Sequence, residues 1–406
     1  MKKVLILLLG LMIIIGAAAC SAGSGTEESG GEPAPDETKA AHTIAVLVYD
    51  RTDEEVLSFR HYLEEYIAKE FDVEFLYSDS ISTQDEALKF ISDAADYGAE
   101  GVMSFNSYDL KTEVDLCADK GMYFMMASGT VTDEAYEAVA DNKAFLGVVG
   151  PGDETEYMAG ANLVEHALIE DEDEDKDHKY FIMSGGAAIG NEMHRLRTVG
   201  AVEKLISAYG VKFDKTSEEI AATSEPLVLE SEGLTICVCP GYPGMDGMDE
   251  KVREAFGDGD YESVLGVLPL TKFMDTFRGA KIGVVDCYSE SNMIAFNAGA
   301  LSYVTGKYSS IIGPSFAAMY NAVTGYADDF RFDGKAFRIK QGFWSSDNRE
   351  DYEEKYSLAS SIEKVAYNYE DLQEVIKEFN PDASLADLMA LAEAYTYEDA
   401  LARRAE

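Results

Sequence analysis

The sequence predicts an α/β protein made of two doubly wound, parallel-sheet lobes. Short β-rich apolar runs alternate with longer segments of helical period, which is typical of a parallel sheet with helical crossovers. The same alternation starts again after Gly150. The chain has 406 residues, of which 47% are hydrophobic, so that it can bury two cores.

The first half contains five expected strands. They cover 44–49, 73–77, 101–105, 122–126 and 144–149. The segments between them have the apolar spacing of helices at 53–70, 83–97 and 109–120.

The second half repeats this alternation of strands and helices. Helices are expected at 154–169 and 191–209, and strands at 179–184, 234–239, 263–268 and 281–286. Beyond Asp347 we expect a helical extension over 348–406, with helices at 369–379 and 385–395, that packs on one lobe.

The N-terminus predicts export. Lys2 and Lys3 precede an apolar run over 4–15, and small residues over 16–19 lead to Cys20. This pattern resembles a bacterial lipoprotein precursor. The resemblance implies that 1–19 is a signal peptide and that Cys20 is lipidated, with palmitate among the attached chains; the alternative is ordinary secretion with Cys20 as a bystander.

Residues 20–41 are rich in Ser, Gly, Glu, Pro and Ala and contain almost no large apolar side chain. Such a segment cannot bury enough surface to fold, so we expect a disordered tether. The expected location is the extracytoplasmic face of the cell membrane, reached through the lipid anchor alone.

Charge and cysteine content exclude several classes of protein. A net charge of −43 repels nucleic acid and anionic lipid, and the acidic run over 170–177 has the composition of a solvated loop, without the glycine and glutamate of an EF-hand. Four cysteines remain once Cys20 is assigned, and the five histidines show no zinc spacing, so we expect buried free thiols and no metal or other cofactor.

Catalytic motifs are also missing. The sequence has no G-x-S-x-G elbow, P-loop, H-E-x-x-H or dinucleotide fingerprint in the right context. We therefore expect a protein that is not an enzyme.

Three segments carry a resemblance to a known family. They are the opening strand over 44–48, the stretch 87–102, and the sequence Arg-Leu-Arg-Thr-Val-Gly at 195–200. In this order, and in an exported chain with two α/β halves, they resemble a solute-binding lipoprotein of an ABC importer with the ribose-binding-like, type 1 periplasmic binding protein fold. The resemblance covers most of 42–345.

The resemblance implies a hinge of three strands between the lobes. Crossings are expected near 150–153, 303–308 and 330–343. The N-terminal lobe would then comprise 42–150 plus about 308–330, and the C-terminal lobe 151–307 plus about 331–347.

Ligands of open α/β sheets bind beyond the carboxyl ends of the strands, where this chain places polar and aromatic residues. Aromatic rings and planar charged groups suit a sugar. The candidate ligand-binding residues are Tyr49, Asp50, Asn106, Tyr108, Ser128, Arg195, Tyr242, Asp286, Lys307 and Trp344.

Four of these candidates also have a purely structural interpretation. Arg195 and Asp286 match ligand contacts of the family, but Arg195 could equally pair with surface acids and Asp286 could cap the following helix. Lys307 lies near the hinge, where an exposed lysine need have no specific role. Trp344 could stack on a ligand or pack in the core.

The expected function is therefore capture of a small polar ligand, a sugar, by a monomer that delivers it to ABC permease subunits. Two alternatives stay open. One is a nucleoside-binding lipoprotein of an importer, and the other is a ligand-sensing surface lipoprotein that partners a receptor kinase.

Overall fold

The computed structural model describes residues 42–169, 177–189 and 191–405. They belong to a single compact unit that starts at Ala40. The expected signal peptide, Cys20, the tether and most of the acidic run lie outside the described residues. Within the described ranges, no helix is both long and apolar enough to cross a membrane.

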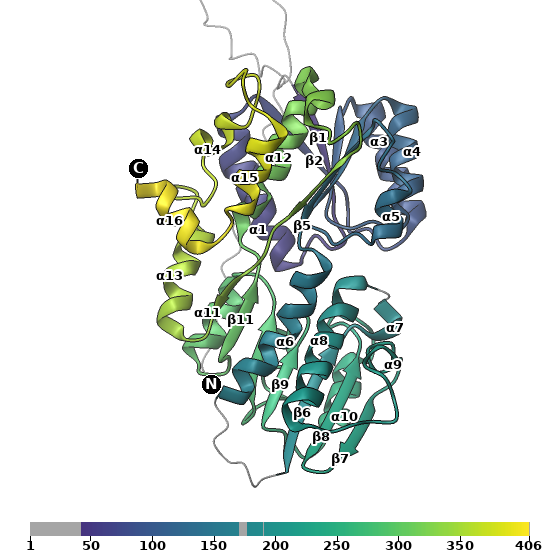
Figure 1. Ribbon diagram of the computed structural model, residues 1–406, viewed down its shortest axis with the longest axis vertical. Helices are drawn as coiled ribbons and strands as arrows, with labels where there is room; N and C mark the ends of the chain where they lie inside the picture. Colours follow the sequence, from purple (N-terminus) through teal and green to yellow (C-terminus); the bar gives the residue numbers. More distant parts are fainter. Residues whose placement is uncertain (1–41, 170–176, 190, 406) are drawn as a thin grey trace, which may run out of the picture. The chain divides into compact units, whose positions relative to one another are not determined.

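The first lobe is built on a six-stranded parallel sheet in the order β12-β5-β4-β3-β1-β2 (Figure 1). Strand β1, next to the edge, pairs with β2 on one side and β3 on the other, so that Ile44 lies opposite both Phe75 and Gly101. The strands are β1 (His42–Leu47), β2 (Val73–Tyr77), β3 (Gly101–Ser104), β4 (Tyr123–Ala127), β5 (Phe145–Gly150) and β12 (Phe337–Lys340).

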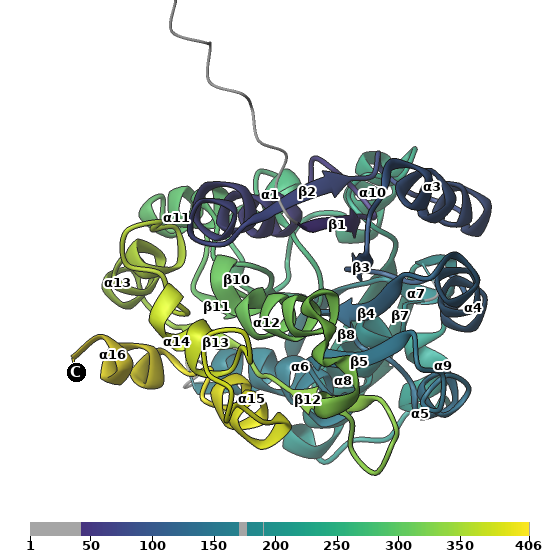
Figure 2. The same cartoon turned by 90° about the horizontal axis from the view of Figure 1, so that it is seen from above.

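Helices cover both faces of this sheet, as the view from above shows (Figure 2). Capping residues begin several of them: Asp53 accepts hydrogen bonds from the backbone at the start of α1, and Thr83 forms a capping box with Glu86. On one face lie α3 (Gln84–Tyr97), α4 (Leu110–Lys120) and α5 (Asp133–Glu137). On the other lie α1 (Glu54–Tyr62), η1 (Leu63–Ile67), α2 (Ala68–Glu70), η3 (Ser309–Ile312) and α12 (Gly313–Asn321), the last followed by η4 (Ala322–Tyr326) and η5 (Ala327–Phe330).

The second lobe has a seven-stranded sheet in the order β13-β11-β10-β9-β6-β8-β7. The inner strands are parallel and the two edge strands are antiparallel. The sequence analysis missed β7, whose Val228 side chain is exposed, because an edge strand has only a short amphipathic pattern. The strands are β6 (His178–Ser184), β7 (Leu227–Ser231), β8 (Leu234–Pro240), β9 (Ser263–Gly266), β10 (Lys281–Val285), β11 (Tyr303–Gly306) and β13 (Trp344–Ser346).

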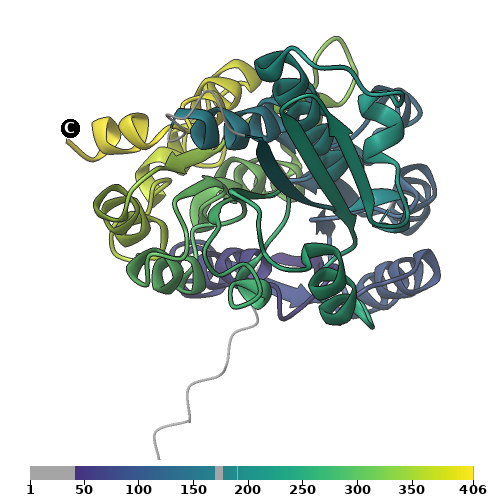
Figure 3. The same cartoon turned by 90° about the horizontal axis from the view of Figure 1, so that it is seen from below.

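Helices again lie on both faces of the second sheet, which is seen from below in Figure 3. The two long helices α6 and α8 pack closely because Gly160 has no side chain: a Cβ atom there would lie 1.8 Å from the carbonyl oxygen of Arg197. The helices are α6 (Asp153–Ile169), α7 (Gly186–Ile189), α8 (Glu192–Tyr209), α9 (Ser217–Ala221), α10 (Met248–Phe256), η2 (Thr271–Phe273) and α11 (Glu290–Asn297).

The chain passes between the two sheets three times, after β5, after β11 and after β12. The assignment of 331–347 to the C-terminal lobe was wrong in part. Strand β12 pairs with β5 in the first sheet, with Ile339 opposite Val149, and only β13 returns to the second. The alternation Phe337-Arg338-Ile339-Lys340 indicates a strand with one buried face but does not say which sheet it joins.

The C-terminal extension is helical, as predicted, but it does not pack on one lobe. Helix α13 (Arg349–Ala359) contacts α11 of the second lobe, whereas α14 (Tyr369–Glu374) and α15 (Leu385–Glu393) contact α12 of the first. The last helix is α16 (Tyr397–Ala405). Figure 1 shows these helices in yellow and yellow-green along one side of both sheets.

The described cysteines Cys117, Cys237, Cys239 and Cys287 are buried free thiols, as predicted. Burial raises the pKa of Cys117 and of Cys239 to about 12. These thiols are therefore protonated and unreactive at neutral pH.

Candidate functional site

A pocket of about 300 Å³ lies where the carboxyl ends of strands from both sheets face each other. One wall follows β1 of the first lobe, and the other follows β8, β9 and β10 of the second. Such strand ends are the usual place for ligands in open α/β sheets. The lining residues are Asp50, Thr52, Asp53, Glu54, Tyr242, Pro243, Gly244, Pro269, Thr271, Lys272 and Asp286.

Asp53 connects the two walls of the pocket. Its Oδ1 accepts a hydrogen bond of 2.9 Å from the Tyr49 hydroxyl, and its Oδ2 accepts one of 3.0 Å from the Tyr242 hydroxyl, which belongs to the second lobe. Burial, together with the charge of Glu55, raises the pKa of Asp53. The carboxylate is thus held by two phenols while it also caps α1.

Asp286 lines the pocket on the second-lobe side. It accepts hydrogen bonds from the backbone of Cys287 at 2.7 Å and from the Asn292 side chain at 2.9 Å. Burial raises its pKa to about 7, and the charges of Asp53 and Glu54 add to the effect. Asp286 therefore changes protonation near neutral pH and can either accept or donate a hydrogen bond to a ligand hydroxyl.

Two further polar contacts join the lobes beside the pocket. Lys307, which is 5% exposed, forms an ion pair with Glu55 at 3.0 Å, and the Ser291 hydroxyl donates to Glu54. All three acids at the start of α1 thus contact the second lobe or the crossing that leads out of it. The N-terminal end of α1 is a main point of contact between the lobes.

A buried ionic cluster lies behind these contacts. The Arg197 guanidinium pairs with Glu156 at 2.5 Å and donates to the carbonyl oxygen of Val267 at 3.0 Å. His194 is buried beside them, and its Nδ1 has no hydrogen-bond partner. Burial and the positive charges of Arg197 and Lys307 lower the pKa of His194 to about 3, so its imidazole is neutral at physiological pH.

Five of the predicted site residues come together at this place. Asp50, Tyr242 and Asp286 line the pocket, Tyr49 donates to the lining residue Asp53, and Lys307 pairs with Glu55 beside the pocket. Asp50 is also the acceptor of a local turn, since its Oδ1 binds the backbone and the hydroxyl of Thr52 at 2.8 Å each.

The other five do not line this pocket. Tyr108 donates to the carbonyl oxygen of Ile81, and Asn106 and Ser128 follow β3 and β4 within the first lobe. Arg195 pairs with Glu192 and Glu218, in agreement with its structural interpretation. Trp344 is buried, stacks on Tyr308 at 3.8 Å between ring centroids, and donates to the carbonyl oxygen of Tyr395.

Sequence reasoning missed Asp53, Glu54, Thr271 and Lys272, which all line the pocket. Asp53 carried a signal, because an aspartate immediately before a helical period is a capping residue and so lies at a strand-to-helix turn. Lys272 follows the expected strand over 263–268. No signal in the sequence places it opposite β1.

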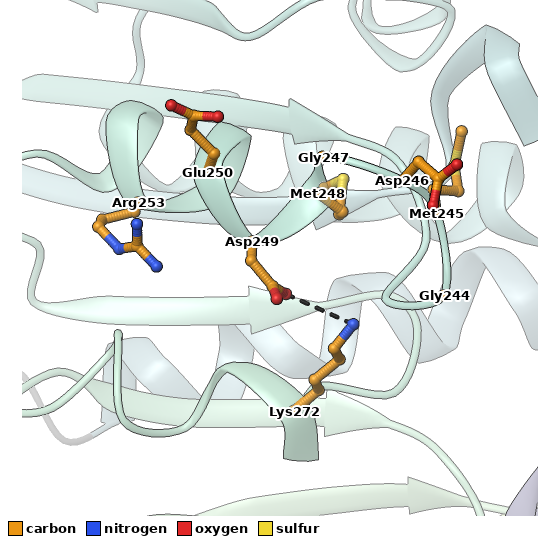
Figure 4. A pocket seen from close by; sticks show the side chains of 9 residues that line it. All are labelled: Gly244, Met245, Asp246, Gly247, Met248, Asp249, Glu250, Arg253 and Lys272. Carbon is orange, nitrogen blue, oxygen red and sulfur yellow. Dashed lines mark ion pairs between the residues drawn. The ribbon is translucent and has the colours of Figure 1, made fainter.

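A larger hollow of about 520 Å³ adjoins the pocket on the second lobe alone (Figure 4). It shares Gly244 and Lys272 with the pocket, and an ion pair of 3.4 Å joins Lys272 to Asp249. Figure 4 shows Asp246, Asp249 and Glu250 around it, all on the turn or first turn of α10. This hollow has no wall from the first lobe.

The described residues hold no group of three or more His, Cys, Asp or Glu side chains arranged to bind a metal ion. The residues that line the pocket offer hydrogen-bond donors, acceptors and one aromatic ring. These groups suit a small polar ligand.

No protein-family model matches the sequence, and a search of curated proteins found no similar sequence. Solved structures do match. A periplasmic sugar-binding protein from Pseudomonas fluorescens has a TM-score of 0.60 at 12% identity, over 86% of this chain and 99% of its own. An ABC transporter solute-binding protein from Bacillus halodurans with bound myo-inositol has a TM-score of 0.56 at 14% identity, over 79% and 99%.

A third structure, from Mycobacterium smegmatis in complex with β-D-fucofuranose, has a TM-score of 0.54 at 13% identity, over 80% of this chain and 98% of that one. At these identities the comparisons establish the fold. The chain has the fold of a type 1 periplasmic binding protein, with two α/β lobes joined by three crossings. The structures are covered almost completely and this chain is not, so it carries segments that they lack.

Proposed function

We propose that this protein is an extracytoplasmic solute-binding lipoprotein that captures a sugar or polyol between its two lobes. The observation that carries the proposal is the pocket itself, which has one wall from each lobe and presents Asp53, Asp286 and Tyr242 to its interior. Two carboxylates can each bind hydroxyl groups, and the tyrosine ring can lie against the apolar face of a sugar.

The size of the pocket supports a small ligand. Small-molecule sites usually enclose roughly 300–1,000 Å³, and this pocket of about 300 Å³ is at the lower limit. The structural neighbours named above include one with bound myo-inositol and one with β-D-fucofuranose, both single-ring polyhydroxyl compounds.

The mechanism that we propose is hinge closure. A ligand that binds both walls favours the arrangement in which Asp53 and Tyr242 lie close together, and the ABC permease would bind that form. Anchoring through Cys20 would keep the protein at the extracytoplasmic face of the membrane. In this proposal the protein is a monomer that binds its ligand and does not catalyse a reaction.

Thermal unfolding of the chain from residue 42 onward tests the proposal, because a ligand that binds only the folded state raises the unfolding midpoint. The panel contains myo-inositol, fucose, other monosaccharides, nucleosides and amino acids. A shift with sugars or polyols that is lost in Asp286→Asn, and kept in the exposed control Asp275→Asn, is the expected result. A shift with nucleosides alone would replace the proposed ligand class.

A further inference from the structure

The pocket between the lobes is lined by four carboxylates, and all four are half-buried. Asp50, Asp53 and Glu54 belong to the first lobe, and Asp286 belongs to the second. Within the part of the chain that the structure describes, their hydrogen-bond partners are hydroxyl, amide and backbone N–H groups, all of them neutral. None of the four forms an ion pair with a described side chain.

Lys272 is the one cation among the described residues that line the pocket, and its ammonium group is engaged elsewhere. It donates to the carbonyl oxygen of Pro243 at 2.7 Å and pairs with Asp249 at 3.4 Å. Asp249 belongs to the neighbouring hollow and does not line the pocket (Figure 4). The pocket therefore has an excess of negative charge.

Other acids of low exposure in this protein are compensated locally. Glu156 pairs with Arg197, and Glu55 pairs with Lys307 beside the pocket. Glu113 has no ion pair within the described ranges, but it accepts hydrogen bonds from a hydroxyl and from backbone N–H groups of its own loop. The four pocket carboxylates differ from these because they line a cavity from two walls and lie among other acids.

The pKa values of the pocket acids are consistent with this repulsion. Burial is the main cause that raises the pKa of Asp286 to about 7, and the charges of Asp53 and Glu54 act in the same direction. Burial and the charge of Glu55 raise the pKa of Asp53. Without a ligand, the protein can relieve the repulsion by binding a proton at Asp286, and a positively charged ligand would relieve it directly.

We propose that the ligand of this pocket carries a positively charged amine, which binds among Asp53, Glu54 and Asp286. The inference rests on the proposed function, because it takes the pocket between the lobes as the ligand site. It narrows the sugar or polyol to an amino sugar or an amino polyol. The ring of Tyr242 suits such a ligand, since an aromatic face attracts both a cation and the apolar face of a sugar.

The charge of the pocket disfavours two other ligand classes. A uronic acid, a sugar phosphate or a free amino acid would bring a negative group into a pocket that already has too many. A bare metal ion is also disfavoured, because the described His, Cys, Asp and Glu side chains form no group of three arranged to hold one. The net charge of −43 favours the approach of a cation from solution.

Matched ligands test the proposal on the wild-type pocket. Calorimetric titration of the chain from residue 20 onward, with Cys20→Ser, compares an inosamine with its N-acetyl derivative and myo-inositol, and glucosamine with N-acetylglucosamine and glucose. Acetylation keeps the nitrogen and removes the charge. We expect each amine to bind at least about tenfold more tightly than its neutral counterparts, because charge-assisted hydrogen bonds are stronger than neutral ones.

The outcomes separate this inference from the proposed function. If the neutral compounds bind as tightly as the amines, the charged ligand is overturned and the sugar or polyol stands. If no member of either set binds, the sugar class fails; binding of putrescine would then support the positive charge, and silence of putrescine would overturn that as well. Tighter binding of Ca²⁺ than of any amine would replace the proposed ligand with a metal ion.

A charge-removing variant locates the amine. Glu54→Gln keeps an acceptor oxygen for the Ser291 hydroxyl, and we expect it to lower the preference for the amine over its neutral counterpart at least about fivefold. Glu134→Gln is the matched control, because Glu134 also lies in the first turn of a helix, α5, but is exposed and outside the pocket. A purely structural role of Glu54 would weaken amine and neutral ligands equally, and that result would contradict the proposal.

Discussion

The hydroxyl of Tyr242 in the second lobe donates a hydrogen bond of 3.0 Å to Asp53 in the first. Asp53 also caps α1 and accepts from Tyr49. A single carboxylate therefore fixes the start of a helix, one wall of the pocket and a contact between the lobes.

Removing the Tyr242 hydroxyl should weaken this contact and leave the fold intact. In Tyr242→Phe, Asp53 keeps its bonds to Tyr49 and to the start of α1, so we expect a loss of about 1 kcal/mol in the contact between lobes. Energy transfer between dyes attached to the two lobes of the ligand-free protein measures this weakening as a larger population with separated lobes. Tyr180→Phe, whose hydroxyl contacts Tyr209 within the second lobe, is the control, and an equal change in both variants would contradict the prediction.

Asp286 should make stability fall as the pH rises. Its folded pKa of about 7 lies above the ordinary value of 3.8, so between these values the folded protein binds more protons than the unfolded chain. The free energy of unfolding then decreases with rising pH by up to about 4 kcal/mol from this group. Asp286→Asn should remove that decrease, as urea unfolding at pH 4.5 and 7.5 will show; identical slopes for the two proteins would be inconsistent with a raised pKa.

His194 should have the opposite effect. Its folded pKa of about 3 lies below 6.5, so the unfolded chain binds more protons between these values and stability rises with pH over this range. His194→Leu removes the titrating group, and the slope of unfolding free energy against pH from 4 to 6 should become smaller. His61→Leu, at an exposed position on α1, serves as control and should keep the wild-type slope.

The buried pair of Arg197 and Glu156 should be costly to break. In Arg197→Met the Glu156 carboxylate is 0% exposed and, among the side chains of residues 42–169, 177–189 and 191–405, keeps the Thr130 hydroxyl at 2.9 Å as its one hydrogen-bond donor. The expected loss is about 3–5 kcal/mol in the free energy of unfolding. Arg197→Met with Glu156→Leu should recover most of it in denaturant unfolding, and a double variant as unstable as the single one would show that shape, not charge, matters.

Lys307 should contribute less to the free energy of unfolding than Arg197 does. Its partner Glu55 is partly exposed, so Lys307→Met leaves a carboxylate that water can still reach, and we expect a loss of about 1–3 kcal/mol. A double-mutant cycle that combines Lys307→Met with Glu55→Gln measures the coupling energy of the pair. Surface ion pairs typically contribute less than about 1 kcal/mol, and we expect a larger coupling energy here.

Apolar periodicity in the sequence was enough to predict the α/β class, most of the strands and long helices, and the places where polar residues follow strands. Local rules suffice for these, since apolar periodicity distinguishes strand 73–77 from helix 84–97 and capping residues such as Thr83 mark helix starts. Tyr242 and Asp286 could be selected as candidates because strand ends are recognisable from the pattern alone.

The folded protein was needed to show which strand ends face each other. Lys272 and Asp53 are more than two hundred residues apart and share a pocket, whereas Asn106 and Arg195 follow strands as regularly and do not line it. It also decided that β12 joins the first sheet and that the C-terminal helices contact both lobes. These outcomes depend on long-range packing of apolar faces, and a local pattern specifies that a face will be buried without specifying its partner.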